Sequence, residues 1–89
     1  MAANQQILKT FGANLRHFRN EKGLSQRDLY ALCNIDNAEI SRMENGEVNV
    51  TLNTLAQLAE ALDIPAYMLL KQWYPFLLNG IAEAGNSFK

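Results

Sequence analysis

The side chains able to act as nucleophiles, general bases or metal ligands are few and unsuitably spaced. The chain has one cysteine, Cys33, and one histidine, His17. A metal site needs several ligands at close spacing, and His17 has no Cys or His partner at such a spacing. Ser25 and Ser41 lack the His and Asp partners that activate a serine nucleophile. We therefore predict no catalytic residue, no metal and no cofactor, and we interpret Cys33 as a small core or turn residue.

The polar residues with the most informative spacing lie in residues 25–46, which predict two short helices joined by a tight turn. Ser25 is followed three residues later by Asp28, which is the pattern of a helix N-cap with a capping box. Asp36 and Glu39 repeat this pattern at the start of the second helix. The turn between them is about three residues long, as expected of a helix-turn-helix.

Apolar residues that recur at spacings of three and four predict helices on both sides of this stretch as well. Asn4 and Thr51 are suitable caps for the first and fourth helices, and Pro65 suits the first turn of a fifth. The residues expected to point into the core are Ile7, Phe11, Leu15, Phe18, Leu29, Leu32, Ile40, Met43, Leu55, Leu58, Ala59, Leu62, Leu69 and Leu70. The sequence thus predicts an all-α fold of five helices.

Three runs of residues together resemble the helix-turn-helix of phage repressor and Cro proteins, the Xre family of transcriptional regulators. They are GLSQ at 23–26, ISRMENG at 40–46 and LAQLAEAL at 55–62. The resemblance covers roughly residues 11–70. It implies a compact lambda-repressor-like domain that binds double-stranded DNA as a transcriptional regulator, either a repressor or an autoregulator.

A chain of 89 residues is one domain by length. We expect residues 1–6 to form an N-terminal arm with the start of the first helix, 7–72 the DNA-binding domain, and 73–89 a short helical extension. One cysteine excludes an intramolecular disulfide, and the longest apolar runs are too short to span a membrane. These features predict a cytoplasmic protein with no membrane partner, and no small-molecule ligand is evident.

The resemblance also implies which residues contact DNA. In the family, base edges are contacted from the start of the third helix and from one turn further on, and Asn37, Ala38 and Arg42 occupy those places here. Arg42 suits the two acceptors of guanine, Asn37 suits adenine, and the Ala38 methyl suits the thymine methyl. Gln26 and Asn45 match phosphate contacts of the family.

Four charged residues complete this set of expectations. Arg27 and Arg16 are further candidates for phosphate contact, with Arg27 next to the matching glutamine. Arg19 and Glu44 match an ion pair of the family between the first and third helices. For this pair we expect a structural role, because buried ion pairs fix geometry more than they add stability.

The charge balance is the main observation against DNA binding. The net charge is −1 and the sequence pI is about 5.7. Asp36 and Glu39 lie at the end of the third helix that must approach DNA, and the loop after Gly46, often basic in the phage repressors, offers Glu47 and no cation. The alternative is a protein-binding module of the same fold, such as an antitoxin or adaptor.

The C-terminal residues Trp73, Tyr74, Phe76 and Leu77 form an aromatic and aliphatic cluster. Two interpretations stay open: the cluster covers the core of its own domain, or it forms the surface of a homodimer. A two-fold dimer would place its recognition helices roughly 34–36 Å apart and would bind a near-palindromic operator.

Overall fold

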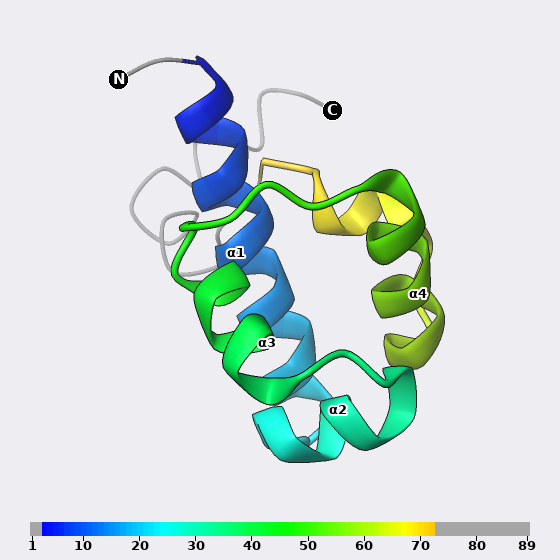
Figure 1. The fold of residues 1–89 in the computed structure, drawn as a ribbon. Helices are drawn as coiled ribbons and strands as arrows, with labels where there is room; N and C mark the ends of the chain where they lie inside the picture. The colour runs from blue at the N-terminus through cyan, green and yellow to red at the C-terminus, as the bar shows by residue number, and fades with distance from the viewer. Residues whose placement is uncertain (1–2, 73–89) are drawn as a thin grey trace.

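The computed structural model describes residues 3–72, which form four α-helices and one 3-10 helix around a single core (Figure 1). These elements are α1 (Ala3–Glu21), α2 (Gln26–Cys33), α3 (Asn37–Glu44), α4 (Leu52–Leu62) and the 3-10 helix η1 (Ala66–Leu69). The predicted all-α class is confirmed. No helix in this part of the chain is both long and apolar enough to cross a bilayer.

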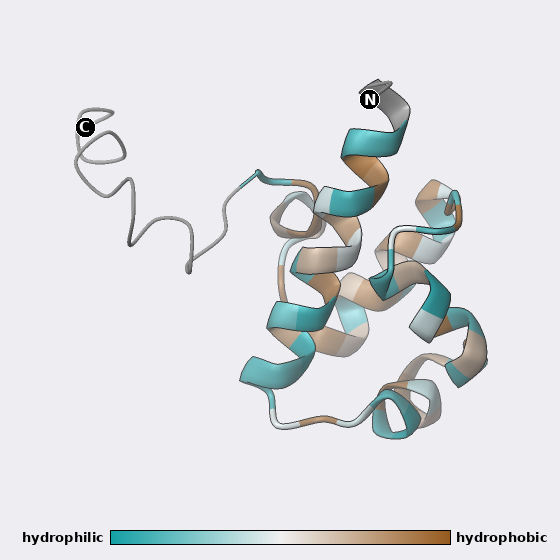
Figure 2. Ribbon diagram, turned by 90° about the vertical axis from the view of Figure 1, so that its left-hand side faces the viewer, coloured by the Kyte–Doolittle hydropathy of each residue, from teal (hydrophilic) through white to brown (hydrophobic). Residues whose placement is uncertain are grey.

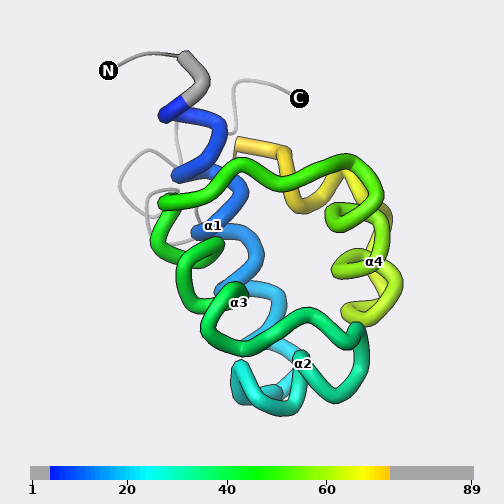
Figure 3. Tube along the Cα trace, in the orientation of Figure 1, coloured from blue at the N-terminus to red at the C-terminus, as the bar shows by residue number. Residues whose placement is uncertain are grey.

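α1 is the longest helix and supports the pair α2 and α3. α3 packs along α1, α2 contacts α3 and α4, and η1 contacts α1 and α4. The trace in Figure 3 follows the chain from α1 through α2, back along α3, and over a long loop to α4. Teal and brown segments alternate along α1 (Figure 2), as expected of a helix with one buried stripe. α1 begins at Ala3, so Asn4 lies inside the helix and not at the predicted cap.

The core draws on every helix. Its buried apolar residues are Phe11, Leu15, Phe18, Leu29, Ile40, Met43, Leu55, Leu58, Ala59, Leu62 and Leu69. All of them are among the residues predicted to point inward. The fourth helix starts as predicted, because the Thr51 hydroxyl accepts a hydrogen bond from the backbone N–H of Thr54 at 3.1 Å.

Three residues predicted to lie in the core are exposed instead. Leu32 is 58% exposed, because the inward stripe of α2 runs from Leu29 to Cys33, a spacing of four and not of three. Ile7 and Leu70 are 48% and 38% exposed. They line a surface hollow of about 150 Å³ between α1 and the start of α4.

The predicted fifth helix is a single 3-10 turn that follows Pro65. The buried Asn14 side chain accounts for its short length, because its amide Nδ2 donates to the carbonyl of Leu69 at 3.0 Å and to that of Lys71 at 2.7 Å. These two carbonyls are thereby satisfied without a further helical turn. The predicted helical extension over residues 73–89 lies outside the described residues.

Candidate nucleic-acid interface

α2 starts with a complete capping box, as predicted. The Ser25 hydroxyl accepts from the backbone N–H of Asp28 at 3.0 Å, and the Asp28 carboxylate accepts from the backbone N–H of Ser25 at 2.9 Å. Hydrogen bonds to its carboxylate, first from the Ser25 backbone N–H and second from the Ser25 side chain, lower the pKa of Asp28. The cap fixes the start of α2 and therefore the position of Gln26, the first residue of that helix.

The turn between α2 and α3 comprises residues 34–36, so its length is the three residues predicted. Asn34 adopts a left-handed conformation with φ 60°, and its backbone N–H donates to the carbonyl of Tyr30 at 2.7 Å. Asparagine is one of the few residues besides glycine that tolerate this conformation. Asp36 then caps α3 as predicted, because its carboxylate accepts from the backbone N–H of Ala38 at 3.0 Å.

α3 lies unusually close to α1 at Gly12. A Cβ atom built on Gly12 would lie 2.4 Å from the carbonyl oxygen of Met43 and 2.7 Å from that of Glu44, which is closer than real Cβ atoms come to other atoms. Only glycine therefore allows this crossing. Gly12 is not among the residues that the sequence patterns single out, although a glycine inside an amphipathic helical pattern is a signal of close packing.

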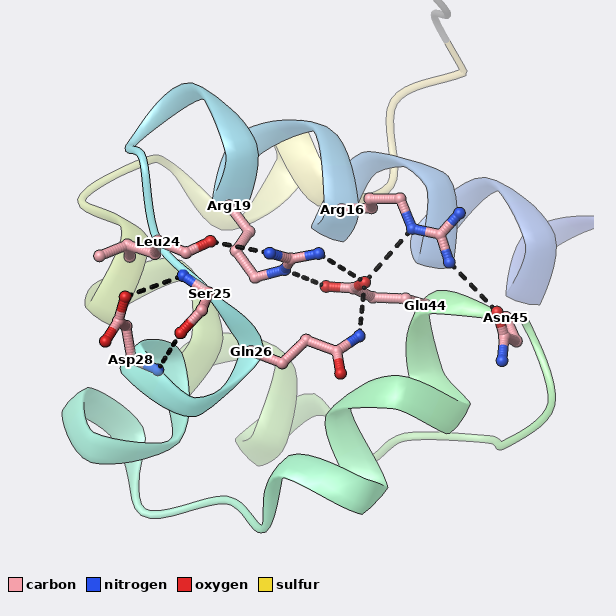
Figure 4. A network of polar contacts seen from close by, with 8 residues as sticks. All are labelled: Arg16, Arg19, Leu24, Ser25, Gln26, Asp28, Glu44 and Asn45. Carbon is pink, nitrogen blue, oxygen red and sulfur yellow. Dashed lines mark hydrogen bonds and ion pairs between the residues drawn. The ribbon is translucent and has the colours of Figure 1, made fainter.

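Glu44, at the end of α3, is the centre of a polar network that joins α1, α2 and α3 (Figure 4). Its side chain is 0% exposed. Arg19 donates from Nε to Oε2 at 2.6 Å and from Nη2 to Oε1 at 3.0 Å, so the expected ion pair is present. Arg16 Nε at 3.3 Å and Gln26 Nε2 at 3.0 Å donate to the same Oε1. Both were expected to contact phosphate, so the sequence patterns miss their bonds to this carboxylate.

The network keeps the Glu44 carboxyl ionised. Burial by itself raises the pKa of Glu44, but the hydrogen bonds from Arg19, Gln26 and Arg16 and the positive charge of Arg19 outweigh it, so the pKa is lowered. Arg19 also donates from Nη1 to the carbonyl of Leu24 at 2.7 Å, which ties the end of α1 to the start of α2. One buried carboxylate thus sets the relative positions of three helices.

The residues predicted to contact bases lie away from the core on α3. Ala38 is exposed and Asn37 is half-buried. The Arg42 side chain is 56% exposed, and its Nη2 donates to Oε1 of Glu39, three residues earlier. Glu39 was predicted to complete a capping box with Asp36, and its carboxylate is paired with Arg42 instead. The guanidinium expected to read a base therefore has an acidic partner on its own helix.

The residues predicted to contact phosphate lie at both ends of the helix pair. Gln26 is half-buried and its amide is oriented by the buried carboxylate, whereas Arg27 is exposed and forms no hydrogen bond or ion pair within residues 3–72. Asn45 is exposed, and its Oδ1 accepts from Arg16 Nη2 at 3.1 Å. Its backbone carbonyl accepts from Lys9 Nζ at 3.3 Å, and no sequence pattern pointed to Lys9.

Trp73, Tyr74, Phe76 and Leu77, predicted to form a dimer surface, lie outside the described residues. Within the described part of the chain, no three His, Cys, Asp or Glu residues are grouped so as to hold a metal ion.

Two capped helices, a short turn between them, and a buried network that fixes the second helix against α1 define a helix-turn-helix domain. The family described as helix-turn-helix matches residues 15–69. The chain belongs to this family, as the resemblance to Xre-type regulators predicted.

Proteins similar to this chain include transcription factors and controller proteins. A hypothetical transcription factor of Neisseria meningitidis serogroup B is 35% identical over 66 residues, which are 74% of this chain and 62% of that relative. The restriction-modification controller protein C.AhdI from Aeromonas hydrophila is 42% identical, with a TM-score of 0.68 over 70% of this chain and 94% of that chain. The controller protein C.Esp1396I, solved as a tetramer in complex with its natural 35 base-pair operator, is 27% identical, with a TM-score of 0.66 over 71% of this chain and 83% of that chain.

Proposed function

We propose that this protein is a sequence-specific DNA-binding transcriptional regulator, a repressor or an autoregulator, that binds a near-palindromic operator. The observation that carries the proposal is the way in which α3 is packed against the rest of the domain. Ile40, Met43 and Glu44 on one side are buried, while Ala38 and Arg42 on the other side are exposed. A helix held this rigidly, with polar groups outward, suits the major groove, which is about 12 Å wide. The similarity to C.Esp1396I, solved with its operator, supports the same partner.

Arg42 would read a guanine by exchanging its partner. In the free protein its guanidinium is paired with Glu39 on the surface of α3. An exposed pair at this spacing is worth about 0.3–0.5 kcal/mol, whereas a bidentate pair with guanine discriminates by about 1–3 kcal/mol. The exchange therefore favours DNA.

Asn37 and Ala38 would supply the remaining base contacts at the start of α3. Gln26, Arg27 and Asn45 would hold phosphates on either side of the groove, which sets the register of the protein without reading sequence. Gln26 suits this role because one amide N–H is fixed on Glu44 while the second remains to donate, and its backbone N–H lies in the first turn of α2. In this role the protein acts in the cytoplasm and carries out no catalysis.

The operator would be bound by a homodimer formed through Trp73, Tyr74, Phe76 and Leu77. Support comes from the exposed Leu70 shortly before this cluster, since exposed apolar side chains favour interfaces. Sedimentation equilibrium tests the dimer, and Phe76→Ser should shift the protein toward monomer while its far-ultraviolet circular dichroism is unchanged. A Phe76→Ser variant with unaltered association would place the dimer surface elsewhere.

Selection of duplexes from a random DNA pool tests the function. Wild type should enrich a two-fold symmetric motif, and Arg42→Ala should lose preference at one guanine in each half-site. Arg27→Ala is the matched control, since it also removes an exposed arginine but should weaken binding equally for all sequences. If folded wild type enriches nothing at low salt, the DNA-binding proposal fails and the adaptor or antitoxin alternative takes its place.

A further inference from the structure

α1 reaches the far end of the recognition helix and brings two cations to it. Gly46 has φ +73°, and a Cβ on it would lie 2.9 Å from Lys9 Cδ and 3.2 Å from Lys9 Cα. The end of α3 therefore lies directly against α1. Lys9 Nζ donates to the carbonyl of Asn45, and Arg16 Nη2 donates to the Asn45 side chain.

These three side chains have hydrogen-bond donors left over on one exposed surface. Arg16 is 51% exposed, and its guanidinium uses Nε on Glu44 and Nη2 on Asn45, which leaves part of its five-donor fork for an outside acceptor. Because Asn45 Oδ1 accepts from Arg16, its amide Nδ2 is left to donate and has no acceptor among residues 5–72. Lys9 is exposed and keeps two of its three donors.

Only with Lys9 and Arg16 present is the end of α3 suitable for an anionic ligand. The C-terminal end of a helix carries partial negative charge, so α3 by itself would repel a phosphate there. Glu47 follows in the next loop and adds a negative charge, with no cation in residues 46–52. Lys9 and Arg16 offset both effects from a neighbouring helix. Glu44 cannot occupy their free donors, since its side chain is buried and already accepts four hydrogen bonds.

We propose that Lys9, Arg16 and Asn45 form a clamp for one phosphodiester of the DNA backbone beside the end of α3. In this protein, cations of α1 take the place of a basic loop after the helix-turn-helix. The clamp rests on the proposed DNA-binding function; it adds Lys9 to its contacts and joins Lys9 at one phosphate with Arg16 and Asn45, which the sequence already suggested as phosphate contacts. It fixes how far α3 slides along the groove, but it reads no base.

The salt dependence of operator affinity tests the clamp. With the selected operator, Lys9→Gln/Arg16→Gln should bind more weakly, and the slope of log K against log salt should become less steep by about 0.9 per protomer for one lost phosphate contact. Base preferences should be unchanged. Lys22→Gln is the control for the loss of one positive charge, since Lys22 is exposed just after the end of α1 and lies outside the clamp. Lys22→Gln should retain most of the wild-type slope of log K against log salt.

Three further measurements separate a clamp from a structural role of Arg16. Arg16→Lys keeps the positive charge and should retain most of the wild-type slope of log K against log salt. Lys9→Gln alone should make this slope less steep, although Lys9 forms no bond to Glu44. Neutral methylphosphonate at the clamped position should weaken wild type but not the double variant. A double variant with the wild-type slope on a confirmed operator would overturn the clamp alone. Failure of wild type to select any operator would overturn the clamp together with the proposed function.

Discussion

Substitution of Gly12 by alanine should destabilise the protein, although alanine is the better helix former. In the interior of a helix, glycine is less favourable than alanine by roughly 0.5–1 kcal/mol, so propensity alone predicts a gain in stability. The crossing of α1 and α3 predicts a loss. The two effects have opposite signs, which makes the sign of the change the decisive observation.

The size of the loss follows from the contact distances. Ordinary contact of a Cβ begins at 3.4 Å, and the new methyl group would lie 2.4 Å from the carbonyl oxygen of Met43, so α1 and α3 must separate by about 1 Å. Both nearest obstacles, in Met43 and Glu44, are backbone atoms, which no side-chain rotation can move aside. Overpacking of this kind costs about 1–3 kcal/mol, and the separation also lengthens the bonds from Arg19 to Glu44. After the propensity gain of roughly 0.5–1 kcal/mol is subtracted from this cost, we expect a net loss of about 1 kcal/mol for Gly12→Ala.

Urea unfolding followed by far-ultraviolet circular dichroism measures this change. Asn20→Ala is the control, because Asn20 is an exposed residue of the same helix and its replacement reports the propensity gain without the crossing. Asn20→Ala should be slightly more stable than wild type, and Gly12→Ala clearly less stable. A Gly12→Ala variant as stable as Asn20→Ala would show that the two helices are not in close contact at this point.

Four other substitutions test three separate parts of the structure. The lowered pKa of Glu44 means that its stabilisation is present above the ordinary glutamate pKa and is lost as the pH falls through the folded-state pKa. Glu44→Gln should therefore cost about 3–5 kcal/mol in urea unfolding at neutral pH and flatten the decline of stability in acid; an unaltered acid decline would contradict this. Leu32→Lys should change stability by less than about 0.5 kcal/mol and Leu29→Ala should cost about 2–5 kcal/mol, and equal costs in thermal unfolding would show that α2 is turned differently. Glu39→Gln, which removes the acidic partner of Arg42, should tighten operator binding in fluorescence anisotropy, and weaker binding would assign Glu39 itself to a base.

The local features of this fold are readable from sequence because their partners are close along the chain. Ser25 and Asp28 are three residues apart, and Asp36 caps the helix that begins directly after it. The same holds for the apolar stripes, which follow from helix geometry alone. The prediction for Leu32 was wrong because the inward residue after Leu29 can lie three or four positions later. A helix of eight residues is too short for the pattern to repeat and so to show which spacing applies.

The features that place the helices relative to one another depend on contacts across the fold. The Gly12 crossing and the bonds of Asn14 to the carbonyls near η1 join segments that are far apart in sequence, so no local pattern contains them. The pair of Glu39 and Arg42 is a different case, because both residues lie on one helix at a spacing of three and the sequence alone contains this pattern. The capping pattern predicts a different partner for the same Glu39 carboxylate, and the two predictions compete.

The most direct test of base reading by α3 is a double-mutant cycle between Arg42 and its guanine. The guanine identified by selection is replaced with 7-deazaguanine, which lacks the N7 acceptor, and binding of wild type and Arg42→Ala is measured on both operators. We predict that wild type loses on the order of tenfold in affinity, as one half of a bidentate pair, while Arg42→Ala loses nothing. Equal losses for the two proteins, or no loss for either, would contradict a contact between Arg42 and that base.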